Sequence, residues 1–176
     1  MFAMRHHRYG GPEVLRLEEA GEPHAGPGQV RVAVRATGVT PADWYLRSGM
    51  LRDIAPLDFP HIPGRDAAGA VDEVGEGVVG TAVGDEVFGL VPFDDQGGAA
   101  AQYATLEAWA HTPRAWSFEE ARGVALTGDP HRTAQLADAG RLTVPLHAVF
   151  PLPETPAAHE VSAAGHARGK IVITVP

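Results

Sequence analysis

The feature that most constrains this chain is the way glycine and proline are spread along it. The sequence has 21 glycines and 15 prolines in 176 residues, and they punctuate its whole length instead of gathering in one linker. Both residues favour turns and interrupt long helices. We therefore expect a mainly β (α+β) fold, an irregular β-barrel of many short strands with a few short helices.

The expected strands are short segments of extended, partly alternating character. Gln29–Ala36 alternates polar and apolar residues with the period of a half-buried strand. Six further segments are expected to be extended: Val14–Glu19, Ala67–Val74, Val83–Val91, Gln102–Leu106, Val144–Leu152 and Lys170–Val175.

Four helices are expected from the residues at their starts. Three starts combine a capping residue with a second signal, namely Thr40 with Pro41, Ser117 with Glu120, and Asp129 with Pro130, and Thr155-Pro156 opens the fourth helix. Gly140 and Gly165 should end the last two helices, and Gly123 and Gly128 should cut the second one short.

Composition and charge exclude several classes of function. The formal net charge is -8 and no basic run opposes it, so nucleic acid is an unfavourable partner. The absence of cysteine excludes disulfides, thiolate zinc sites and a cysteine nucleophile. The N-terminus lacks a signal-peptide core and no apolar stretch reaches about 18 residues, so we expect a cytoplasmic protein without membrane contact.

One glycine motif imitates a dinucleotide fingerprint. Gly75–Gly80 spells G-x-G-x-x-G after an expected strand. The fingerprint needs a helix to follow it, because the pyrophosphate lies on the helix N-terminus. The next segment, Thr81–Val87, is β-branched and broken by turn signals, so we interpret the motif as a turn between two strands.

Several blocks together resemble medium-chain dehydrogenases/reductases of the zinc-independent quinone oxidoreductase group. In chain order they are Tyr9–Leu15, Gly38–Gly49, Pro63–Gly69, Val83–Val87, Ser117–Ala121, Gly140–Leu142, Val149–Leu152 and Arg168–Val172. Each block is weak alone, but their order and spacing are specific. The resemblance implies a single GroES-like catalytic domain, built from residues 1–121 and a C-terminal returning segment, residues 129–176.

Two departures from the family affect cofactors. Zinc-dependent members have a cysteine in place of Thr40 and a His-Glu pair in place of Arg65 and Asp66, so we expect no metal here. The family also inserts a Rossmann domain after the Ser117 helix, which takes on the order of 100 residues. Asp129 follows Ala121 too closely for that. We therefore expect no bound cofactor, with NADPH only if another chain supplies its domain.

The resemblance also implies a substrate cleft beside Gly38–Gly49. Thr40 stands where relatives often have an asparagine next to the nicotinamide, and Tyr45 where a tyrosine lines the substrate space. Tyr45 is then a candidate general acid, or a ring packed at the barrel rim. Asp43 and Trp44 are candidate substrate contacts, with a first-turn helix acid and a core indole as the alternatives.

A second group of candidates precedes the strand at Ala67. Asp66 is a candidate catalytic base and Arg65 a candidate substrate contact, with a structural ion pair between them as the alternative. His61 borders the same region, should titrate near neutrality, and is a candidate acid or base. Asp94–Asp95 is expected to be a solvated loop. His6, His7, His159 and His166 have no convincing partner, and the last two are expected at the surface.

Three functional hypotheses follow. The intact substrate-side segment without a nucleotide cradle favours a cofactor-independent enzyme, which binds an enone or polyketide-like carbonyl compound and catalyses cyclisation, isomerisation or hydration. The second hypothesis is an NADPH-dependent quinone or enone reductase whose nucleotide domain is supplied elsewhere or was removed. The third is a non-catalytic binding module. A homodimer through the surface left by the missing domain is a further expectation.

Overall fold

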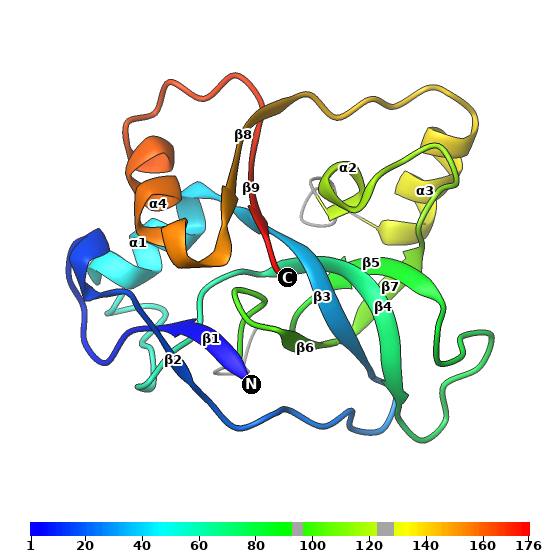
Figure 1. The fold of residues 1–176 in the computed structure, drawn as a ribbon, viewed down its shortest axis with the longest axis horizontal. Helices are drawn as coiled ribbons and strands as arrows, with labels where there is room; N and C mark the ends of the chain where they lie inside the picture. The colour runs from blue at the N-terminus through cyan, green and yellow to red at the C-terminus, as the bar shows by residue number, and fades with distance from the viewer. Residues whose placement is uncertain (93–96, 123–128) are drawn as a thin grey trace.

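A computed structural model describes residues 1–92, 97–122 and 129–176, and its elements are short, as the turn-rich sequence predicts (Figure 1). The strands are β1 (Phe2–Arg5), β2 (Arg16–Glu19), β3 (Val30–Val39), β4 (Asp66–Val74), β5 (Glu86–Leu90), β6 (Tyr103–Leu106), β7 (Ala108–His111), β8 (Leu146–Pro151) and β9 (Lys170–Thr174). The helices are α1 (Pro41–Ser48), α2 (Phe118–Arg122), α3 (Pro130–Asp138) and α4 (Thr155–Ala163). No helix in these ranges has the length and apolar character needed to cross a membrane.

The central strand of the fold is β3, which runs through the middle of Figure 1. The larger sheet has the order β7-β5-β4-β3-β9-β8, with β6 also pairing with β3, while β1 and β2 form a separate sheet. The β8–β9 pair is parallel and the other pairs are antiparallel. The predicted mainly β fold is confirmed, but the described sheets are open, because β7 and β8 are edge strands and do not pair to close a barrel.

The hydrophobic core follows the alternation predicted for the Gln29–Ala36 segment. Val30, Val32 and Val34 of β3 are buried, whereas the residues between them are partly exposed. They pack with apolar side chains of β1, β4, β9 and α4 in one cluster. Burying this row of valines stabilises the fold by about 25 cal/mol per Å² of apolar surface removed from water. The hydrogen bonds of β3 to its neighbouring strands add to this packing.

Most predicted turns and caps are confirmed. Thr40 caps α1, the Ser117–Glu120 capping box begins α2, and the Asp129 carboxylate accepts a hydrogen bond from the His131 amide at 2.8 Å at the start of α3. The Gly75–Gly80 segment is a turn between β4 and β5, not the start of a helix. Gly123, Gly128 and Asp94–Asp95 lie outside the described residues.

The C-terminal segment returns to the N-terminal part of the domain. β9 pairs with the second half of β3, with Ile171 opposite Val39, and α4 packs against α1. The amide of Lys170 donates to the Pro145 carbonyl oxygen at 2.9 Å, which fixes the start of β9 beside β8. These contacts place residues from both ends of the sequence around the N-terminus of α1.

Three histidines are buried with an arginine in this region. His6, His61 and His159 are each no more than 4% exposed. The Arg47 guanidinium donates from Nε to Nδ1 of His159 at 3.3 Å and from Nη1 to the Gly10 carbonyl at 2.6 Å. The expectation that His159 lies at the surface is wrong, because it lies on the face of α4 that packs against the core. Burial, followed by the charge of Arg47, lowers the pKa of His159 to about 3.

Burial also changes the pKa of His61 from the value near neutrality that the sequence analysis expected. Its backbone exchanges hydrogen bonds with His6, and the two rings lie edge to face with centroids 5.4 Å apart. Burial, followed by the positive character of His6 and Arg65, lowers the pKa of His61 to about 3. His61 therefore stays neutral near pH 7, and the prediction that it titrates near neutrality is wrong, since desolvation disfavours the imidazolium.

Stability is expected to fall as the pH drops below about 6.5. Unfolded imidazoles take up protons near pH 6.5, whereas folded His61 and His159 stay neutral down to about pH 3, so acid favours the unfolded state between these values. Each histidine costs about 2 kcal/mol at about pH 5. Urea unfolding across this range measures the slope. His159→Asn, which keeps an acceptor for Arg47, should reduce it, and the exposed His166→Asn is the matched control. An unchanged slope in H159N contradicts the assignment.

Gly69 is expected to tolerate no side chain. It lies in β4 opposite Val34, beside an irregularity in the pairing, and an added Cβ would collide with the backbone carbonyl oxygen of Ala33. We expect Gly69→Ala to lower the free energy of unfolding by about 2–3 kcal/mol, the usual cost of overpacking. Gly21→Ala is the control, because a Cβ there meets no atom within 4 Å. Equal stability of the two variants in urea would refute this packing.

Candidate functional site

The main candidate site is a cavity of about 390 Å³ beside the N-terminus of α1, here named the Thr40 cavity. Its walls come from both ends of the sequence. The lining residues are Val39, Thr40, Pro41, Pro145, Ser162, Gly165, Ala167, Gly169, Lys170 and Ile171. The cavity thus lies where the returning segment meets the end of β3, and Thr40 is the predicted site residue that it contains.

A capping box fixes Thr40 at the cavity wall. The Asp43 carboxylate accepts hydrogen bonds at 2.7 Å from both the amide and the hydroxyl of Thr40. Its other oxygen accepts from the Gly64 amide at 3.1 Å, which joins α1 to the loop before β4. Burial raises the pKa of Asp43, and these hydrogen bonds oppose the shift. Asp43 is 4% exposed and lines neither cavity described here, so it positions Thr40 and does not contact a ligand there.

Trp44 and Tyr45 form an aromatic pair on α1. Their ring centroids are 3.9 Å apart with the planes tilted by 39°. Both residues are half-buried, and neither lines the Thr40 cavity. Nε1 of Trp44 is buried and has no hydrogen-bond partner among the described residues. Tyr45, the predicted acid, is therefore close to Thr40 in the sequence but does not line the cavity in the structure.

Arg65 and Asp66 tie loops to the sheet. Nη1 of Arg65 donates to the Pro92 carbonyl at 3.0 Å. The Asp66 carboxylate accepts from the Gly38 amide at 2.9 Å, and the Asp66 carbonyl accepts from the Thr37 hydroxyl at 2.8 Å. Both charged side chains are buried and line neither cavity, so these contacts hold β3, β4 and the preceding loop together. His61 lies in the same buried layer.

Two residues of the cavity were missed by the sequence analysis. Lys170 is half-buried and is the one lysine in the chain. Ser162 is 8% exposed and lies on α4. The sequence could have pointed to Lys170 as a candidate, because it is the one lysine in the chain. Ser162 could not be recognised from the sequence, because its place in the cavity depends on how α4 packs against α1 and β9.

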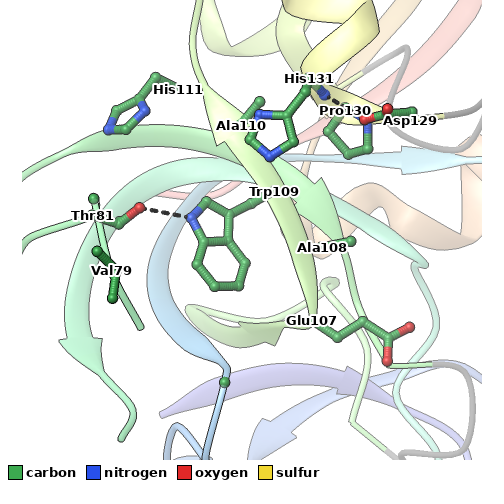
Figure 2. Close-up of a pocket in the computed structure, with 12 residues that line it drawn as sticks. Val79, Thr81, Glu107, Ala108, Trp109, Ala110, His111, Asp129, Pro130 and His131 are labelled. Carbon is green, nitrogen blue, oxygen red and sulfur yellow. Dashed lines mark hydrogen bonds between the residues drawn. The ribbon is translucent and has the colours of Figure 1, made fainter. Parts of the chain in front are cut away.

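A second cavity, of about 490 Å³, lies around Trp109 of β7, the edge strand at the opposite end of the larger sheet from β8 (Figure 2). The indole N–H of Trp109 donates to the Thr81 hydroxyl at 3.0 Å, and the start of α3 closes one side with His131. His111 lies on the rim and contacts the Asp85 carboxylate at 3.1 Å. This cavity contains none of the residues that the sequence analysis proposed for the site.

The arrangement of possible donor side chains among the described residues does not favour a metal site. In residues 1–92, 97–122 and 129–176, no group of three or more histidine, cysteine, aspartate or glutamate residues is placed to hold a metal ion. At the positions implied by the resemblance, Thr40 donates its hydroxyl to Asp43 and Arg65 is a cation, so neither provides a zinc ligand.

Comparisons with known proteins agree with this geometry. Residues 26–115 match the family model described as the alcohol dehydrogenase GroES-like domain. The quinone oxidoreductase of Sus scrofa is 38% identical over 140 residues, which are 78% of this chain and 40% of that protein. The quinone oxidoreductase of Rattus norvegicus is 36% identical over 135 residues, 76% of this chain and 39% of that protein. The chain thus spans about 40% of the length of these relatives.

Solved structures show the same fold. The Escherichia coli quinone oxidoreductase complexed with NADPH matches with a TM-score of 0.64 and 28% identity, over 86% of this chain and 44% of that one. A crystal structure of an NAD-dependent alcohol dehydrogenase matches with a TM-score of 0.89 at 18% identity, over 100% of both chains, and supports the fold alone. Together with the family model, these matches show that the chain belongs to the medium-chain dehydrogenase/reductase superfamily, as a quinone oxidoreductase-like member with a GroES-like domain.

Proposed function

We propose that this chain is the substrate-binding half of an NADPH-dependent quinone or enone oxidoreductase, and that it acts with a nucleotide-binding domain outside its described residues. The observation that carries the proposal is the Thr40 cavity. It has a mostly apolar wall and contains Thr40, the residue that the resemblance puts next to the nicotinamide. Its volume of about 390 Å³ lies within the usual size of small-molecule sites.

The one dinucleotide-like motif in the sequence, Gly75–Gly80, does not have the geometry of a pyrophosphate site. The Gly75–Gly80 motif lies in a turn between β4 and β5, and no helix N-terminus follows it to receive a pyrophosphate. We therefore assign this chain no role in holding the nucleotide and derive no step through it. The part we assign to it is to bind the carbonyl substrate and exclude water from one side of it.

The names of the relatives support an oxidoreductase over the other hypotheses. The curated matches are quinone oxidoreductases, and one of the matched structures holds NADPH. The cofactor-independent hypothesis relied on Tyr45, Asp66 and His61 as acid and base. These three residues do not line the Thr40 cavity, Asp66 accepts from Gly38, and His61 is buried and neutral. Proton-transfer chemistry therefore has less support here than substrate binding for a reductase.

An exposed apolar edge of the sheet supports contact with another domain or with a second copy of the chain. β8 is an edge strand, and its residues Leu146 and Val149 are 40% and 50% exposed. Both come from the returning segment, next to the Thr40 cavity, where a nucleotide-binding domain or a second copy of the chain would bury them. We include self-association through this edge in the proposal, and sedimentation at several protein concentrations measures it.

The proposed substrate site predicts a specific effect of filling the cavity. Ala167 lines the Thr40 cavity and is exposed, so Ala167→Trp should occupy it without disturbing the core. We expect this variant to bind 2,3-dimethyl-1,4-naphthoquinone at least about tenfold more weakly in equilibrium dialysis, equivalent to about 1.4 kcal/mol. Ala163→Trp, exposed at the end of α4 and outside the cavity, is the matched control and should bind normally.

Two outcomes would overturn the proposal. The first is that the wild-type chain binds neither this quinone nor a carboxylated analogue of it in the cavity. The second is submillimolar binding of NADPH to the chain alone, detected by nicotinamide fluorescence. This chain would then bind the nucleotide itself, whereas the proposal assigns that role to another domain.

A further inference from the structure

The charge of the Thr40 cavity is opposite to that of the protein. The formal net charge of the chain is -8. The segments 139–153 and 161–176, which supply most of the cavity wall, contain Arg141, Arg168 and Lys170 but no acidic residue. Lys170 is the one charged side chain that lines the cavity, and no carboxylate lines it. A cleft of one sign in a protein of the other sign concentrates ligands of opposite charge, here anions.

The ammonium group of Lys170 is available to a ligand. No ion pair or hydrogen bond joins this side chain to any of the described residues, although its backbone is held by the Pro145 carbonyl at the start of β9. The ammonium of a lysine without a carboxylate partner is a strong donor toward an oxyanion. The fixed backbone limits the positions that the ammonium can reach from the cavity wall.

The hydroxyl groups of the cavity divide into one donor and one acceptor. Thr40 donates its proton to the Asp43 carboxylate at 2.7 Å, so toward the cavity it can only accept. Ser162 makes no side-chain hydrogen bond within the described residues and is free to donate. Two residues with free donor groups, Lys170 and Ser162, therefore line the cavity together with the Thr40 oxygen and with apolar residues such as Val39 and Pro41.

We propose that the Thr40 cavity selects an anionic carbonyl substrate, whose carboxylate binds the ammonium of Lys170 and the hydroxyl of Ser162 while its apolar body packs on Val39 and Pro41. This inference rests on the proposed function and names the class of substrate. The same oxyanion chemistry is present in a phosphate group, either inorganic or in a nucleotide, so the experiment compares these sources.

The test uses a charged and a neutral twin of one quinone. The probes are 3-carboxymethyl-2-methyl-1,4-naphthoquinone and its methyl ester, both substituted at the ring positions that amines attack. We expect the acid to bind at least about tenfold more tightly than the ester in equilibrium dialysis, as one charge-assisted hydrogen bond allows. Lys170→Gln should reduce the affinity for the acid to that for the ester, and Lys170→Arg should keep most of the preference.

Controls separate this contact from general charge effects. Arg168→Gln removes a neighbouring positive charge that is exposed and does not line the cavity, so it should change the preference by less than about twofold. Thermal unfolding of K170Q should match the wild type, because the Lys170 side chain has no ion-pair or hydrogen-bond partner among the described residues and its backbone contacts are kept. Reductive methylation with ¹³C-formaldehyde provides one ε-dimethylamino signal, from the single lysine, which the acid should shift and the ester should not.

The outcomes distinguish the inference from the proposed function. Equal affinity of acid and ester, both lost in A167W, overturns the inference and leaves the proposed function standing. Binding of neither quinone overturns both. Inorganic phosphate or NADPH that shifts the Lys170 signal at submillimolar concentration, while the carboxylated quinone does not, also overturns the inference, because the anion would then belong to a phosphate source.

Discussion

The pairing of β3 is the constraint on which the rest of this structure depends. The first half of β3 pairs with β6 and the second half with β9, while β4 pairs along the other edge. One strand therefore joins β4 and β6 to the returning segment, and the chain continues from its end directly into Thr40 and α1. If β9 did not pair with the second half of β3, Lys170 and Ile171 would not reach the wall of the Thr40 cavity.

Buried polar groups hold this arrangement in place without contacting a ligand. Asp43 and Asp66 each accept a hydrogen bond from a backbone amide of a neighbouring loop or strand, and Arg47 joins α1 to α4 and to the N-terminal loop. Such groups must be satisfied when they are buried, so they specify one packing of the loops around the sheet. Several residues that resemble catalytic candidates in the sequence have this structural function, which explains why charged residues near a cleft do not all line it.

The predictions from sequence succeeded where a local physical rule decides the outcome. Thr40, Ser117 and Asp129 begin helices because their side chains satisfy free backbone amides, and the Gly75–Gly80 motif is a turn because the residues after it do not favour a helix. The predicted strands appear at nearly the expected positions, but β1 and β7 were missed. An irregular β-barrel was predicted, whereas β7 and β8 remain edge strands in the described sheets.

The site was predicted less completely than the fold. Thr40 lies in the cavity, but Asp43, Arg65, Asp66 and His61 are buried outside it, and Trp44 and Tyr45 pair with each other. Sequence neighbours of a site residue do not share its exposure, because successive residues of a helix point in different directions. The protonation of His61 and His159 was also beyond the sequence, since a pKa depends on desolvation by residues that are distant in the chain.

The sequence by itself determined the short elements, their caps, the lack of cysteine ligands and the family to which the chain belongs. These properties depend on residue types and on near neighbours in the chain. Only the tertiary structure decided that Lys170 and Ser162 share a cavity with Thr40 and that His159 is buried beside Arg47. The physical reason is that these contacts require β9 and α4 to return to β3 and α1, and such long-range packing depends on the whole core.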